Sequence, residues 1–148
     1  MMLRVAKDLE VLMSIHEEWA DLILKGTKLW EFKRKCALSP GMGVWIYSTA
    51  PRREIVGFFT IGEIRRVSAR RPDPSLARDG ALTVAQLRNY LTGLDFGFAI
   101  EVTHLRRVQT SIRLSKGRNG PESYRYLYPD GPDASLVRRL AHAALVRA

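Results

Sequence analysis

The chain has 148 residues, of which 46% are hydrophobic and 26% are charged, as is usual for a globular protein. We expect one domain spanning residues 1–148, because a chain of this length buries roughly 70% of its unfolded surface without a structural metal or disulfide. Its one cysteine excludes an internal disulfide. No apolar run approaches the about 18 residues of a membrane span, and charges interrupt the N-terminal segment. We therefore expect a cytoplasmic protein with no membrane contact, no metal and no cofactor.

The charge balance points to an anionic partner. The 24 lysines and arginines outnumber the 15 acidic residues, which gives a formal net charge of +9. Basic residues are concentrated in two stretches, 52–71 and 103–125. A positive surface gains affinity for nucleic acid by releasing counterions from the phosphates. An arginine-rich surface without such a partner fits the composition equally well, so charge alone leaves both interpretations open.

The first half of the chain predicts one strand, one helix and then three strands. Residues 11–15 form an apolar run of strand length, and the amphipathic segment after it predicts a helix that ends at Gly26. Ser14 and Glu17 have the spacing of a capping box for this helix. The three strands that follow cover residues 29–33, 44–49 and 55–61.

The second half predicts a loop and then alternating helices and strands. Residues 67–79 are polar and contain two prolines, which indicates little regular structure. Thr83 and Gln86 predict a capping box at the start of the next helix. The predicted elements are a helix at 83–91, strands at 96–103 and 123–128, and a C-terminal helix at 133–147. This pattern predicts an α+β protein, a small mixed or antiparallel β-barrel with two helices and the C-terminal helix outside it.

A short motif between the first helix and the second strand adds a family resemblance. Residues 26–31 read Gly-Thr-Lys-Leu-Trp-Glu and match the pattern Gly-x-Lys-x-x-Glu. With the strand and helix before it, this segment resembles the ASCH domain, a member of the PUA-like superfamily of small β-barrels. The strands at 44–49 and 55–61 and the segment 121–127 agree with that resemblance. It covers about residues 11–128 and leaves out the C-terminal helix.

The resemblance implies a role with RNA. PUA-like barrels generally handle RNA or modified bases, and ASCH domains are thought to use the cleft beside the Gly-x-Lys-x-x-Glu turn. Some small ASCH proteins look like amidohydrolases that act on acetylated cytidine, and others are linked to cleavage of single-stranded RNA. The amidohydrolase group carries a threonine nucleophile where this chain has Glu31, which counts against that reaction. Asp79 lies near the position of its acidic proton donor, without matching it clearly.

Lys28 and Glu31 are the main candidates for a functional site. Lys28 can neutralise a phosphate, or act as a base if burial lowers its pKa. Glu31 can orient Lys28, accept a hydrogen bond from a base, or take part in acid–base catalysis. A spacing of three places them on opposite faces of a regular strand, so they converge only if Lys28 lies in the turn or a bulge intervenes. A solvated lysine after a helix is the alternative.

Further candidates lie at the end of the strand at 44–49 and in the basic loop that follows. Tyr47 can stack on a base, and Ser48 is next to it. Arg52 and Arg53 are candidates for phosphate contacts, although a solvated pair on a loop is equally ordinary.

Four more residues complete the expected nucleic-acid surface. The ASCH resemblance implies that Ser123 and Arg125 line the other wall of the cleft. Arg34 and Arg113 are expected to attract phosphates without a fixed contact.

Three functional hypotheses follow. The first is a binding module that holds RNA, single-stranded or as a modified nucleotide, in a basic cleft. The second is a metal-independent enzyme in the same cleft, either a single-stranded ribonuclease or an amidohydrolase on a modified nucleoside. The third is a DNA-binding regulator that uses the helix at 83–91, and it ranks last because Arg88 is the only basic residue there.

Overall fold

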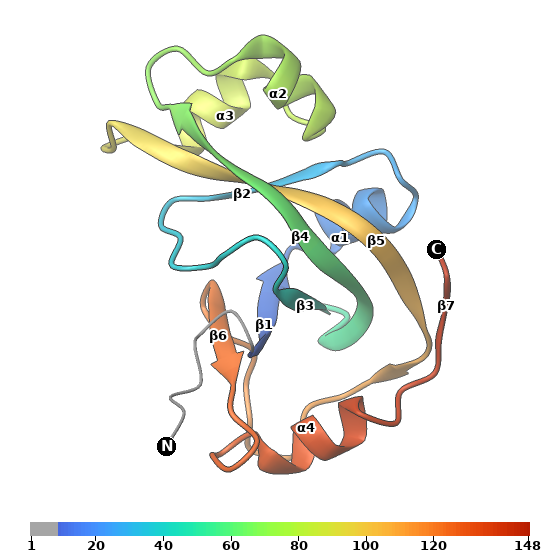
Figure 1. The fold of residues 1–148 in the computed structure, drawn as a ribbon. Coiled ribbons are helices and arrows are strands. Elements are labelled where there is room, and N and C mark those ends of the chain that lie inside the picture. The colour runs from blue at the N-terminus through green and yellow to red at the C-terminus, as the bar shows by residue number, and fades with distance from the viewer. Residues whose placement is uncertain (1–8) are drawn as a thin grey trace.

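The fold is built on one curved sheet with helices packed on its outside (Figure 1). The computed structural model describes residues 9–148. The strands are β1 (Glu10–Ile15), β2 (Trp30–Lys33), β3 (Gly43–Ser48), β4 (Glu54–Ser68), β5 (Phe96–Ile112), β6 (Tyr124–Leu127) and β7 (Leu145–Arg147). The helices are α1 (Glu17–Leu24), α2 (Pro74–Asp79), α3 (Val84–Tyr90) and α4 (Ala134–Leu140).

The sheet is mixed and its two ends are not paired with each other. The strand order is β2-β5-β4-β3-β1-β6, and β7 pairs with β5 beside this path. β1 and β3 run parallel, whereas the other pairings within residues 9–148 are antiparallel. The predicted mixed α+β class is confirmed. The sheet curves in the way expected of a small barrel, but main-chain hydrogen bonds do not close it between β2 and β6.

The curvature comes from the two longest strands. β4 has 15 residues and β5 has 17, and their pairing shifts register at three places. Such bulges bend a strand and increase its twist. The sequence predicts only the apolar parts of these strands, because their outer parts carry exposed basic residues.

Each helix covers its own part of the sheet. α1 packs through Ile23 against the cluster formed by β1, β3 and β4. α2 and α3 pack through Leu76 and Leu87 over the part of the sheet formed by β2, β5 and the end of β4. α4 packs through Leu136 in the same cluster as Trp45 of β3. No helix within residues 9–148 has the length and apolar character needed to cross a membrane.

Two predictions, one in each half of the chain, are wrong. Ser14 does not cap α1, because it belongs to β1 and its Oγ donates a hydrogen bond to Pro121 O, 2.6 Å away. The expected loop at 67–79 contains α2. Asp73 caps this helix by accepting a hydrogen bond from Ser75 N at 2.9 Å, and Pro74 starts it in a favourable position.

The C-terminal prediction is wrong beyond Leu140. The predicted helix at 133–147 ends there, and the chain turns to form β7, which pairs antiparallel with β5. Leu145, which the helix prediction placed on an apolar face, is instead 38% exposed in β7, and its neighbour Val146 is 39% exposed. β7 provides hydrogen-bond partners for main-chain groups of β5. This pairing joins residues far apart in the sequence, so the helical periodicity of the C-terminal segment does not reveal it. By contrast, the capping box between Thr83 and Gln86 is confirmed.

Candidate functional site

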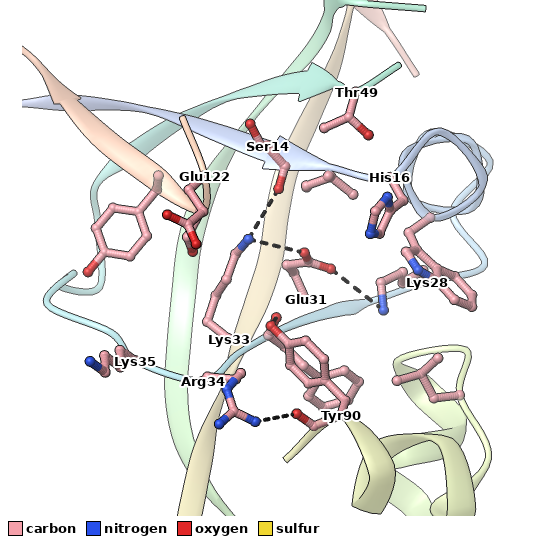
Figure 2. Close-up of a pocket in the computed structure, with 16 residues that line it drawn as sticks. Ser14, His16, Lys28, Glu31, Lys33, Arg34, Lys35, Thr49, Tyr90 and Glu122 are labelled. Atoms are coloured by element: carbon pink, nitrogen blue, oxygen red, sulfur yellow. Dashed lines mark hydrogen bonds and ion pairs between the residues drawn. The ribbon is translucent and has the colours of Figure 1, made fainter. Parts of the chain in front are cut away.

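An open pocket of about 700 Å³ lies between β2 and the paired strands β1 and β6. Its walls come from the end of β1 and the start of α1, from residues 28 and 31–35, from Tyr90 of α3, and from the segment that leads into β6 (Figure 2). The pocket therefore sits between the two ends of the strand order. Side chains brought there come from parts of the chain that are far apart in sequence.

Lys28 and Glu31 converge at this pocket. Gly26 has a φ of +81°, a left-handed conformation that glycine adopts readily, and it ends α1. Because β2 begins at Trp30, Lys28 still lies in the turn, which is the geometry that convergence requires. Its Nζ lies 3.7 Å from Glu31 Oε1 (Figure 2). Both residues are buried, with 2% and 7% of their surfaces exposed.

Lys33 completes a three-residue charged cluster. It lies two residues after Glu31 on the same face of β2, and its Nζ is 3.7 Å from Glu31 Oε2. The same ammonium donates a hydrogen bond to Ser14 O at 3.1 Å. One carboxylate therefore lies between two buried ammonium groups, and the cluster carries an excess positive charge when all three groups are ionised. Sequence reasoning did not select Lys33, although its alternation with Glu31 contained the signal.

The surroundings of Lys28 alter its chemistry. Burial lowers the pKa of Lys28 below its ordinary value of 10.5, and the carboxylate of Glu31 partly offsets this effect. The ammonium donates a hydrogen bond to Gly80 O at 2.5 Å, at the end of α2. It also lies 4.9 Å from the ring centroid of Phe32 and 5.4 Å from that of Trp19, within the range of cation–π attraction.

Tyr90 forms another part of the wall. Its hydroxyl donates a hydrogen bond to Phe32 O at 3.3 Å, and 40% of the residue is exposed. Burial raises the pKa of Tyr90, and the charge of Glu31 adds to the effect. Arg34, predicted to attract phosphates, lines the pocket and donates hydrogen bonds to Tyr90 O at 2.7 Å and Thr92 O at 3.0 Å. Arg34 therefore ties the end of α3 to β2.

Four of the predicted site residues line the pocket and six do not. The four are Lys28, Glu31, Arg34 and Ser123, and the six are Tyr47, Ser48, Arg52, Arg53, Arg113 and Arg125.

Two of the six are buried and two are on the nearby turn. Tyr47 and Ser48 at the end of β3 are both buried, and Ser48 has no exposed surface. Arg52 pairs with Glu17 at 3.2 Å, and Arg53 is exposed. The predicted base contact of Tyr47 does not fit this burial, because its ring packs in the core.

Arg113 and Arg125 form ion pairs elsewhere. Arg113 lies 3.6 Å from Glu54. Arg125 points to the face of β6 opposite the pocket, where it donates to both carboxylate oxygens of Asp133 at 2.8 and 2.9 Å. Arg118 donates to the same carboxylate at 3.0 Å. Arg125 was predicted to line the cleft, but it forms this structural ion pair instead. Neighbouring side chains alternate across a strand, so Arg125 faces away from the pocket that Tyr124 lines.

Sequence reasoning missed several other pocket residues. Ser14, His16 and Trp19 lie where β1 passes into α1, and Tyr124 is the first residue of β6. These residues share one property, which is that they lie at ends of strands or helices that face β2. That signal depends on the strand order, which a single sequence does not provide.

The chain resembles known proteins both in sequence and in structure. No family model matches the chain. A protein of Zymomonas mobilis subsp. mobilis called an "ASCH domain-containing ribonuclease" is 30% identical over 88 residues. The match covers 58% of this chain and 59% of that relative, which is less than two thirds of its length.

Solved structures resemble nearly the whole chain. The crystal structure of ASCH from Zymomonas mobilis has a TM-score of 0.77 and 22% identity, covering 96% of this chain and 99% of that one. A tyrosine-to-phenylalanine variant of the same protein has a TM-score of 0.75 and 21% identity, covering 91% and 99%. The chain therefore has the fold of these ASCH structures. The resemblance to ASCH domain proteins predicted from residues 26–31 is confirmed.

Proposed function

We propose that this protein binds single-stranded RNA, with a phosphate and its nucleotide held in the pocket beside Lys28, Glu31 and Lys33. The observation that carries the proposal is the buried cluster of two ammonium groups around one carboxylate. An anion placed there would balance the excess positive charge inside a partly desolvated site, where electrostatic interactions are stronger than in water. A pocket of about 700 Å³ has the size usual for small-ligand sites.

The rest of the wall suits a nucleotide better than a bare anion. Trp19, Tyr90 and Tyr124 bring aromatic surface to the same pocket, and base–aromatic stacking is the common way to hold an unpaired base. The name of the Zymomonas mobilis relative, a ribonuclease, favours RNA over DNA as the ligand.

Binding can be tested with a fluorescently labelled single-stranded RNA of mixed sequence. We expect affinity to fall steeply as salt is raised from about 50 mM to 200 mM, because bound phosphates displace counterions. Lys33→Met and Lys28→Met should weaken binding, whereas Lys25→Met, at an exposed position after α1, should not. Affinity that is flat with salt and equal in all four proteins would contradict the proposal.

Cleavage of RNA is a second candidate function. The relative's name supports it, and so does a buried lysine whose pKa is lowered next to a carboxylate. Neutral Lys28 would take the proton of a ribose 2′-hydroxyl, whose oxygen attacks the adjacent phosphorus. The 5′-oxygen then leaves with a proton taken from solvent water, and a 2′,3′-cyclic phosphate remains. Lys33 would neutralise the charge that develops on the phosphate.

This second function has its own test. Purified protein and the Lys28→Met variant are incubated with end-labelled single-stranded RNA in EDTA. We expect cleavage by the unaltered protein alone, and none of a strand whose 2′-hydroxyls are replaced by hydrogen. Equal cleavage by both proteins would indicate a contaminating nuclease, and no cleavage by either would leave binding as the function.

The other hypotheses have less support. An amidohydrolase of the ASCH type needs a nucleophile beside Lys28, where the contacts are instead Glu31 and Gly80 O. A DNA-reading role for α3 is also disfavoured, because Arg88, its basic residue, donates through Nε to Arg70 O.

A further inference from the structure

Three tyrosines form a row along one face of β6. Tyr124 and Tyr126 lie at alternate positions of the strand, and Tyr128 follows with the same spacing. The ring centroids are 6.4 Å apart for the first pair and 6.2 Å for the second. Tyr124 and Tyr126 are partly buried against the core, whereas Tyr128 is 51% exposed. Packing of the core therefore accounts for the first two rings and leaves the third, a large exposed aromatic, without a structural role.

The row is continuous with the pocket. Tyr124 lines it, and Tyr128 lies at the other end of the row. The hydroxyl of Tyr124 accepts a hydrogen bond from Ala37 N at 2.7 Å, and the hydroxyl of Tyr126 donates to Ala37 O. These bonds fix two of the rings against the segment that follows β2. β6 itself is at the end of the strand order, so its outer side is not covered by another strand of the described sheet.

We infer that the tyrosine row is a stacking platform for the bases of a single-stranded RNA that extends out of the pocket. The inference rests on the proposed function and adds a second binding surface to it. Stacking on aromatic rings tolerates any base, because every base has a π-face. The platform therefore predicts a binding site several nucleotides long with little sequence preference.

Charge and spacing both favour bases over phosphates at this surface. The cations Lys28, Lys33, Arg34 and Lys35 line the pocket. Arg125, within the row's own strand, points to the opposite face and is bonded to Asp133. Ring centroids 6.2–6.4 Å apart exceed the roughly 3.4 Å rise of stacked nucleotides. The planes of neighbouring rings are also inclined by 86° and 53°, so the row suits a strand whose bases are separated from one another and contact the rings singly.

The test compares short and long RNA. A dinucleotide and a hexanucleotide of 2′-fluoro-uridine, which lack the hydroxyl needed for cleavage, are measured by fluorescence anisotropy. We expect the unaltered protein to bind the hexanucleotide more tightly. Tyr128→Ala should weaken hexanucleotide binding by about fivefold or more and leave dinucleotide binding unchanged. Tyr128→Phe should bind like the unaltered protein, since the ring is retained.

Two controls separate stacking from other effects. Leu145→Ala removes a partly exposed apolar side chain on β7 and should leave both affinities unchanged. The loss caused by Tyr128→Ala should be the same at about 50 mM and 200 mM salt, because stacking releases no counterions. If Tyr128→Ala binds the hexanucleotide as tightly as the unaltered protein, the inference of a stacking platform is wrong, whereas the proposed RNA binding in the pocket is not contradicted. If the unaltered protein binds neither oligonucleotide, both this inference and the proposed function are overturned.

Discussion

Glu31 Oε2 lies 3.7 Å from Lys33 Nζ, and both side chains are almost fully removed from solvent. The other carboxylate oxygen lies at the same distance from Lys28 Nζ. Neither lysine could be buried cheaply without this carboxylate, because an unpaired charge in the interior is costly. Glu31 therefore stabilises the charged cluster on which the proposed RNA site depends.

The first prediction concerns removal of that carboxylate. Glu31→Gln should lower the free energy of unfolding by about 3–5 kcal/mol, because two buried ammonium groups lose their counter-charge. Urea denaturation measures the effect. Glu63→Gln removes a carboxylate from an exposed pair with Arg65 and should cost about 0–1 kcal/mol. Equal losses in the two variants would mean that Glu31 does not stabilise the cluster.

The second prediction concerns alkaline pH. The pKa of Lys28 is lower in the folded chain than its ordinary value of 10.5, so the unfolded chain binds more protons between these two values. The stability of the unaltered protein should gain a contribution as pH rises through this interval. Lys28→Met lacks that contribution, so the unfolding free energy of the unaltered protein minus that of the variant should increase with pH.

Chemical denaturation at several alkaline pH values measures this difference. Lys25→Met, at an exposed position, controls for the loss of an ammonium group from the chain. A difference between the unaltered protein and Lys28→Met that stays constant or shrinks as pH rises would contradict the lowered pKa.

The third prediction concerns the pair of arginines on Asp133. Burial acts to raise the pKa of Asp133, but the bonds from Arg125 and Arg118 outweigh it and hold the pKa below its ordinary 3.8. The folded chain therefore gains stability above that value and loses it as pH falls through the lowered pKa. Asp133→Asn should cost about 1–3 kcal/mol at neutral pH and flatten this acid dependence.

RNA binding provides a second readout for the same cluster. Arg125→Ala should lower stability without weakening binding of a short RNA, because its guanidinium points away from the pocket. Arg138→Ala, at an exposed position on α4, is the matched control for loss of an arginine. A large loss of affinity in a folded Arg125→Ala protein would restore Arg125 to the RNA site.

The fourth prediction concerns close packing behind Lys28. A Cβ at Gly80 would lie 2.3 Å from the ring of Phe32, which is buried and cannot move freely. Gly80→Ala should therefore lower stability by about 1–3 kcal/mol. At Gly131 the nearest atom to a new Cβ is Tyr128 Cβ at 3.6 Å, an ordinary contact, so Gly131→Ala should have a much smaller effect in the same thermal or urea unfolding measurement.

The sequence allowed prediction of features that depend on local order. The turn at Gly26, the meeting of Lys28 with Glu31 and the capping box at Thr83 all involve residues within six positions of one another. The alternation of β2 also places Lys33 on the same side of the strand as Glu31, but sequence reasoning did not select it as a site residue.

Features that depend on which strands are neighbours were not predictable in the same way. Whether Arg125 or Tyr124 faces the pocket depends on the register of β6 with β1. The basic residues most prominent in the sequence, Arg52 and Arg113, form ion pairs on other surfaces. Charge content favours an anionic partner, whereas strand order decides which residues surround the pocket.

The unpaired ends of the strand order have a mechanical consequence. Lys33 reaches across to Ser14 O, and Tyr124 to Ala37 N, so side chains hold together what a ladder of main-chain bonds would otherwise join. Side chains can rotate away and return quickly, whereas unzipping a strand disrupts a cooperative unit. If the pocket binds a nucleotide as proposed, the nucleotide can therefore enter at this junction without breaking the main-chain pairing of any strand.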